Sequence, residues 1–184
     1  MYEKSLIIKF DYSNEQTVGQ ITKVVGLVKA KYLIPVIDAL DLKANPRSSK
    51  TGPVTKAITD SIVNDPELFP FKTKGILLAA SQYERLERNR IKMSPDDLEI
   101  EGILDGGHNT LAIGLYILSE AMSYTGKELP RGEKTWDQFK VLWEENRTDI
   151  DRYMEAQRNG EETGSMGFYV PVELLVPRDA GDAA

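Results

Sequence analysis

The apolar residues of this chain fall into short runs and into longer stretches with helical spacing. The short runs are typical of strands, and they predict strands over residues 5–10, 24–29, 75–80, 98–104 and 168–176. The run over 75–80 is continuously apolar, which indicates a strand buried on both faces. Turn formers at 13–15 predict the end of the first strand, and residues 83–92 alternate loosely, as in an extended arm or a hairpin.

The longer stretches predict helices over residues 36–41, 53–62, 110–124 and from Thr135 to about Gly160. Pro53 suits a first helical turn, and the Asn-Asp-Pro sequence at 64–66 ends that helix. The stretch 110–124 is apolar almost all round, so its helix belongs in the core. Thr135 and Gln138 form a capping box at the start of the last helix.

Together these elements predict a mixed α/β fold of the α+β kind, with one mixed sheet. We expect a single domain over residues 1–176 and a flexible tail over 177–184. A chain of 184 residues, 41% of them hydrophobic, is long enough to bury a core without cross-links.

The amino-acid composition excludes several kinds of chemistry. The chain has no cysteine, which excludes disulfides, thiolate metal sites and a cysteine nucleophile, and which fits a cytoplasmic protein. No apolar run approaches the roughly 18 residues that cross a bilayer, so we expect no membrane partner. The formal charge of −6 opposes nonspecific attraction to a phosphate backbone.

Any nucleic-acid contact must therefore be local. One basic cluster, interrupted by Glu84 and Glu87, is more typical of a solvated surface than of a nucleic-acid site; it contains Arg85, Arg88, Arg90 and Lys92. An aromatic stripe at helical spacing is more typical of core than of a base-stacking surface; it contains Trp136, Phe139 and Trp143.

The candidate site is the Asp-Gly-Gly-His-Asn-Thr sequence at 105–110, where a strand turns into the apolar helix. The start of a helix carries unpaired N–H groups, and its dipole favours an anion such as phosphate. Gly106 and Gly107 allow the backbone to approach a ligand closely and can supply those N–H groups.

The side chains around the glycines carry further chemistry. Asp105 can hold a divalent cation, and His108 can donate to phosphate or act as acid or base. Thr110 can cap the helix. An alternative stays open, in which Asp105 and Asn109 only turn the chain and His108 is a satisfied polar residue at a helix start.

The segment 103–112 resembles the Asp-Gly-Gln-His-Arg (DGQHR) box of the ParB and sulfiredoxin-like superfamily. It is also similar to the Gly-Gly-Gln-Thr box of the abortive-infection phage-resistance (AIPR) proteins. The order of the preceding pieces is similar to that of AIPR proteins, and these pieces are 45–47, 54–62, 66–69 and 74–76. The resemblance covers roughly residues 25–120.

The resemblance implies a ParB/sulfiredoxin-like domain that binds a nucleotide or a DNA phosphate in a phage-defence or DNA-processing protein. Among relatives with this box, NTPase and nuclease activities occur, so a hydrolase that uses Mg²⁺ and a nucleoside triphosphate is one expectation. The implied catalytic residues are Asp105, which would also bind the metal, and His108. The implied phosphate-binding residues are Gly106, Gly107, Asn109, Thr110, Arg47 and Lys74.

The chain departs from the family pattern at several positions. Asn109 stands where one version of the box has arginine, which favours binding over catalysis. Lys72 or Lys74 can replace that cation, although solvated lysines are the alternative. Without cysteine, the sulfiredoxin reaction has no support. An enzyme, a non-catalytic regulatory or DNA-binding module and a structural interaction domain therefore stay open, as do a homo-oligomer and a larger parent chain.

Overall fold

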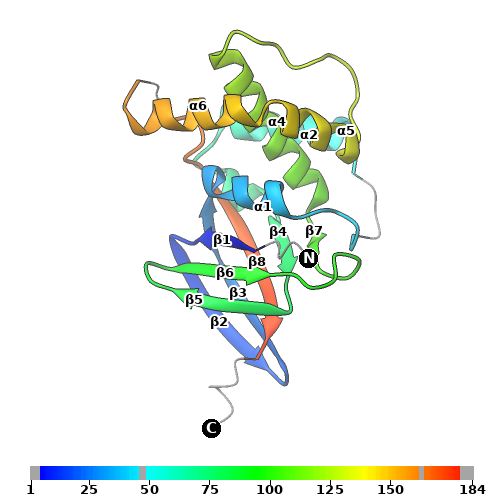
Figure 1. Ribbon diagram of the computed structural model, residues 1–184, viewed down its shortest axis with the longest axis vertical. Coiled ribbons are helices and arrows are strands. Elements are labelled where there is room, and N and C mark those ends of the chain that lie inside the picture. The colour runs from blue at the N-terminus through cyan, green and yellow to red at the C-terminus, as the bar shows by residue number, and fades with distance from the viewer. Residues whose placement is uncertain (1–4, 46–48, 162–163, 179–184) are drawn as a thin grey trace.

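The computed structural model describes residues 5–45, 49–161 and 164–178, and within these ranges the strands form two sheets (Figure 1). The smaller sheet is antiparallel, in the order β1 (Leu6–Lys9), β6 (Arg90–Ser94) and β5 (Gln82–Leu86). The larger sheet has the order β2 (Tyr12–Val18), β3 (Ile21–Lys29), β8 (Tyr169–Pro177), β4 (Ile76–Ala79) and β7 (Gly102–Asp105). Figure 1 shows the smaller sheet crossing in front of the larger one, with the helices gathered at one end.

The larger sheet is mixed, because β4 runs parallel to β8, whereas the pairs β2–β3, β3–β8 and β4–β7 are antiparallel. The mixed α/β class is thus confirmed, but the prediction of one sheet is wrong. The chain leaves the smaller sheet directly after β1. Phe10 N–H donates to Asn89 O at 3.0 Å, and Asp11 N–H donates to Leu27 O at 3.0 Å, so consecutive residues bond to different sheets.

The turn predicted at 13–15 is also wrong, because these residues lie inside β2. All seven residues of β2 are exposed, and the strand pairs with β3 along its whole length. An edge strand that is exposed along its whole length has no alternation of apolar and polar residues. Hydrophobic periodicity therefore cannot predict it. The predicted hairpin over 83–92 is confirmed as β5 and β6.

The predicted helices lie close to their expected positions, and α3 (Phe69–Lys72) is an additional short helix that was not predicted. The helices are α1 (Ile34–Ala39), which follows a 3₁₀ turn (Ala30–Leu33), α2 (Pro53–Asn64), α3, α4 (Gly107–Tyr124), α5 (Trp136–Glu145) and α6 (Arg147–Arg158). The Thr135 capping box is confirmed, but the single helix predicted after it is broken at Asn146. The Asn146 side-chain amide donates to Leu142 O at 2.9 Å, which competes with continuation of the helix. In the part of the chain that the structure describes, no helix combines the length and hydrophobicity needed to cross a membrane.

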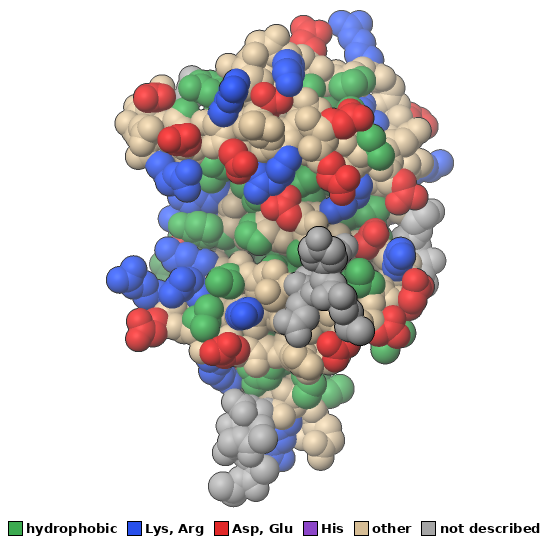
Figure 2. All heavy atoms as spheres, viewed as in Figure 1, with side chains coloured by type: hydrophobic (Ala, Val, Ile, Leu, Met, Phe, Trp, Pro, Cys, Tyr) green, Lys and Arg blue, Asp and Glu red, His purple; other side chains and the backbone are tan. Residues whose placement is uncertain are grey.

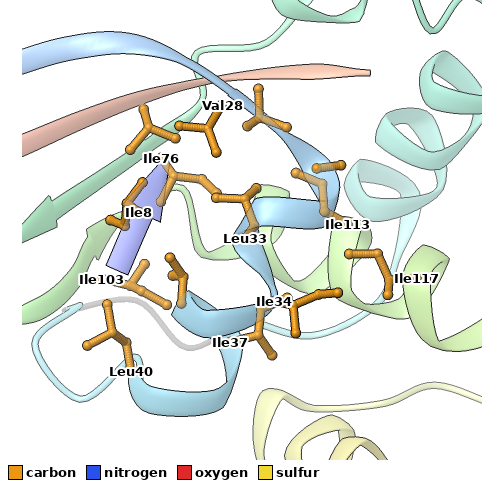
Figure 3. Close-up of a cluster of buried hydrophobic side chains, with 14 of the residues drawn as sticks. Ile8, Val28, Leu33, Ile34, Ile37, Leu40, Ile76, Ile103, Ile113 and Ile117 are labelled. Atoms are coloured by element: carbon orange, nitrogen blue, oxygen red, sulfur yellow. The ribbon is translucent and has the colours of Figure 1, made fainter. Parts of the chain in front are cut away.

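Helix α4 is central to the core, as its apolar circumference predicts. Figure 3 shows Ile113 and Ile117 of α4 on the side of Leu33 and Ile34, with Ile8, Ile76 and Ile103 of the two sheets on the other side of the same core cluster. Ile103 belongs to β7, the strand that leads into α4, and is fully buried. The turn between β7 and α4 is therefore held at both ends by core packing.

The surface outside this core is mixed in charge. Figure 2 shows acidic and basic side chains interspersed over the helices, with basic side chains gathered at the left of the view, beside the β5–β6 hairpin. Arg85 of that hairpin pairs with Glu15 of β2, which neutralises part of the basic cluster. The aromatic stripe of α5 is buried, as predicted, with Phe139 at 0% and Trp143 at 1% exposure.

Candidate functional site

The turn between β7 and α4 begins where β7 lies beside β4 (Figure 1). Asp105 pairs with Leu77, and Gly106 then adopts a left-handed backbone with φ of +84°. A Cβ at Gly106 would overlap the carbonyl oxygen of Gly75 and lie 2.9 Å from the Cα of Ile76. Both the dihedral angle and the close approach of two main chains therefore require glycine at this position.

Hydrogen bonds fix the first turn of α4 against β4. The side-chain amide of Asn109 donates to Gly75 O at 2.8 Å. The N–H and the hydroxyl of Thr110 both donate to Gly106 O, at 2.8 and 2.9 Å. Thr110 was predicted to cap the helix, but the helix begins at Gly107 and the N-cap is Gly106, so Thr110 lies within the first turn and is 1% exposed.

The N–H groups at the start of α4 are open. Gly106 N–H donates to Asp105 Oδ1 at 2.8 Å. Within the described residues, the N–H groups of Gly107, His108 and Asn109 donate no hydrogen bond. Three adjacent donors at the positive end of an 18-residue helix form a favourable position for an anion.

These donors border a cleft of about 990 Å³. One wall is apolar and comes from α2, with Val54, Ala57 and Ile58. The polar part of the lining is the main chain at Gly75 together with the segment 105–109. An amphipathic cleft of this size can hold a small molecule that has an apolar end and an anionic end.

Of the charged side chains that line the cleft, Lys72 and Glu173 are paired. Lys72 bonds to Asp65 at 3.0 Å, and Glu173 pairs with Lys23 at 3.1 Å. Lys74 is exposed, lines the cleft and makes no ion pair with another described residue. Lys74 is therefore the cation of this cleft whose charge remains available to a ligand.

The structure brings most of the predicted site residues to this cleft, whose lining includes Asp105, Gly106, Gly107, His108, Asn109 and Lys74. His108 is half-buried there, and its ring makes no hydrogen bond to a described residue. The amide nitrogen of Asn109 is engaged by Gly75, and Thr110 does not line the cleft. Arg47 lies outside the described residues.

Two features of the cleft were not predicted from the sequence. The apolar face of a surface helix normally packs into the core, yet Val54 of α2 is 57% exposed and borders the cleft. Ser49 lines the cleft beside Gly107 and is only 3% exposed. A serine within a stretch of turn-forming residues gives no signal of burial, so sequence reasoning could not have found it.

The loop that carries Ser49 is attached at both ends to the start of α5. The indole Nε1 of Trp136 donates to Asp41 Oδ1 at 2.8 Å, and the backbone N–H of Trp136 donates to Ser49 O at 3.0 Å. Thr51 N–H donates to Lys134 O at 2.8 Å. The position of Ser49 at the cleft thus depends on Trp136.

A buried carboxylate orders the segment that precedes β7. Glu101 accepts hydrogen bonds from the N–H groups of Asp96 and Asp97, at 2.8 and 2.6 Å, and from the hydroxyl of Ser81. Burial acts to raise the pKa of Glu101, but these hydrogen bonds outweigh it, and the pKa lies below its ordinary value of 4.5.

Asp105 is the predicted metal ligand, and its surroundings fit a magnesium ion that is shared with a phosphate. The side chain is exposed, and within the described part of the chain its Oδ2 accepts no hydrogen bond. The described residues contain no group of three or more histidine or acidic side chains that could hold a metal ion without other ligands. Magnesium is commonly held by one or two carboxylates together with substrate phosphates and water, so a single carboxylate fits this arrangement.

Comparisons with protein-family models, with curated proteins and with solved structures find no match for this chain. The resemblance of the segment 103–112 to the ParB and sulfiredoxin-like proteins therefore remains an expectation. The cleft and its open N–H groups are therefore the basis on which a function is inferred.

Proposed function

We propose that the cleft binds a nucleotide, or a nucleic-acid phosphate, with its phosphate at the start of α4. The observation that carries this proposal is the open N–H groups of Gly107 and His108 at the border of a cleft with an apolar wall. A ParB/sulfiredoxin-like domain of a phage-defence or DNA-processing protein is the biological context that we propose, on the basis of the motif at 105–110.

The phosphate is supported by the electrostatics of the turn. Unpaired N–H groups and the helix dipole favour an anion at Gly107 and His108. Lys74 adds a full positive charge from the neighbouring segment. When bound at Asp105, Mg²⁺ would neutralise phosphate charge that would otherwise be repelled by this carboxylate.

Binding of a nucleoside is supported by the apolar wall that α2 forms. Apolar surface faces the cleft at Val54, Ala57 and Ile58. Val54 is exposed, so the protein's own core does not cover this surface. Covering such surface with a planar base would remove it from water, which is favourable by about 25 cal/mol per Å². A phosphate alone would leave the apolar wall without a role.

Binding is better supported than hydrolysis. A side chain that acts as a general base is usually oriented by a third group, and no described residue forms a hydrogen bond to the His108 ring. The Asn109 amide is committed to Gly75 and replaces the arginine that one version of the box would supply. We therefore propose a binding or regulatory module, with an NTPase or nuclease that uses Asp105 and His108 as the second candidate.

Thermal unfolding and isothermal titration with ATP, GTP, CTP and their diphosphates, with and without Mg²⁺, test the proposal. At a ligand concentration of 100 times Kd, binding adds about 2.7 kcal/mol to the free energy of unfolding, which raises Tm by several degrees. Lys74→Ala should weaken binding, whereas Lys56→Ala on α2, an exposed lysine that does not line the cleft, should not. If no nucleotide binds to the wild-type protein, the proposal is wrong.

Phosphate-release and plasmid-nicking assays separate the two candidates. The binding module predicts no turnover above background for the wild-type protein, with or without Mg²⁺. Turnover that is abolished in both Asp105→Asn and His108→Ala, with nucleotide binding retained, would establish the enzyme instead.

A further inference from the structure

Ser49 is a buried polar residue whose hydroxyl has no hydrogen-bond partner among the described residues. It is 97% buried, since its exposure is 3%, and its hydroxyl forms no hydrogen bond with the described residues. It nevertheless lines the cleft, and its Oγ lies so close to Gly107 that a Cβ at Gly107 would overlap it. A polar side chain as deeply buried as Ser49 normally has a hydrogen-bond partner, and because Ser49 lines the cleft, a ligand group at the start of α4 can supply it.

The glycines at the start of α4 are closely packed. A Cβ at Gly107 would lie 3.1 Å from Asn45 Nδ2 and 3.4 Å from Leu42 Cδ1. The main chain of Gly75 and Ile76 contacts Gly106. Gly107 and His108 line the cleft, so a ligand group reaches their N–H groups from the cleft.

From this geometry we propose that Ser49 Oγ and the N–H groups of Gly107 and His108 form a subsite for a terminal phosphate. This inference rests on the proposed function, and it specifies which phosphate is bound. A terminal phosphate has three free oxygens, one for each of these donors. An internal phosphodiester is esterified on two sides, so it has only two free oxygens for the three donors.

A terminal phosphate can belong to a free nucleotide or to the 5′ end of a DNA strand. Both present the same three oxygens to Ser49 and to the start of α4. The ligand panel therefore contains AMP, 3′,5′-cyclic AMP, a short oligonucleotide with a 5′-phosphate and the same oligonucleotide with a 5′-hydroxyl. We expect AMP to bind and cyclic AMP, which has only an internal diester, not to bind.

Titration of the wild-type protein, Ser49→Ala and Ser123→Ala with this panel tests the subsite. Ser123 is an exposed serine near the end of α4 that does not line the cleft, so Ser123→Ala serves as the matched control. Loss of one hydrogen bond to a charged group should weaken AMP binding by Ser49→Ala roughly tenfold or more, with Ser123→Ala close to the wild type. If Ser49→Ala weakens the binding of the 5′-phosphorylated oligonucleotide and AMP does not bind, the ligand is a DNA end.

Failure of the subsite and failure of the proposed function give different results. Nucleotide binding that is equal in the wild type and Ser49→Ala overturns the subsite but leaves the proposed function standing. Equal binding of AMP and cyclic AMP by the wild type also overturns the subsite, and this comparison does not depend on the folding of any variant. Absence of binding by every phosphate ligand contradicts both.

Discussion

The side-chain amide of Asn109 donates a 2.8 Å hydrogen bond to the main-chain carbonyl of Gly75, and this bond joins the first turn of α4 to the start of β4. The two residues border the same cleft, and Gly106 lies in close contact with Gly75 beside them. The position of the open N–H groups thus depends on a polar contact between segments that are distant in the sequence.

Replacement of Asn109 by alanine should destabilise the protein. Without the amide, the Gly75 carbonyl loses its side-chain donor in a partly buried setting, at a cost of about 1–2 kcal/mol in the free energy of unfolding. Urea unfolding measures the effect, and Asn64→Ala at the exposed end of α2 is the matched control. Equal stability of the two variants would show that the Asn109–Gly75 bond does not hold the turn.

Trp136 should act as a positioning residue for the cleft. Trp136→Phe keeps an aromatic ring but removes the indole bond to Asp41, whereas Trp143→Phe removes the equivalent bond from Trp143 to Asp38, which is 2.7 Å long. Each substitution should lower the free energy of unfolding by about 1–2 kcal/mol. Only Trp136→Phe should weaken nucleotide binding in titration, because Trp143 holds no segment that carries a cleft residue. Equal affinities of the two variants would contradict this role.

Gly114→Ala tests the packing of α4 against α5. Alanine favours helix by about 1 kcal/mol over glycine, but a Cβ at Gly114 would overlap Cζ of Phe139, a ring that is fully buried. We expect overpacking to dominate, with a net loss of about 1–3 kcal/mol in urea unfolding. Gly167→Ala, where a Cβ would meet nothing within 4 Å, should change stability little. A stabilised Gly114→Ala would contradict the observed helix contact.

The Glu101 carboxylate should make stability depend on pH. Its pKa in the folded protein lies below the ordinary value of 4.5, so its contribution is complete above about pH 4.5 and is lost as the pH falls through the lowered folded pKa. Glu101→Gln should therefore be less stable than the wild type at pH 7 by about 1–3 kcal/mol, and the difference should shrink towards pH 3. Urea unfolding between pH 3 and 7 measures both curves. A difference that stays constant over this range would show that the carboxylate is not the relevant group.

Local signals in the sequence predicted much of this site. Gly106 and Gly107 stand between a short apolar run and a long apolar helix, and the structure places them at that junction. The Thr135 capping box is likewise confirmed, because both of its hydrogen bonds lie within four residues.

Features that depend on distant partners were not predicted. The strand β2 is polar along its length and takes its conformation from pairing with β3. The break at Asn146 is followed by Arg147, whose side chain bonds both carboxylate oxygens of Asp38, at 2.9 and 3.0 Å. The burial of Ser49 depends on its contact with Gly107. Each of these features is fixed by tertiary contacts, which hydrophobic periodicity does not encode.

A titration of ¹⁵N-labelled protein with ATP and Mg²⁺, followed by amide NMR, tests the phosphate site at the start of α4 directly. We expect the largest changes in chemical shift at the N–H groups of Gly107 and His108, because these donate to the bound phosphate. The amide of Gly167, which does not line this cleft, should not move. Binding that leaves the Gly107 and His108 amides unchanged would contradict a phosphate site at the start of α4.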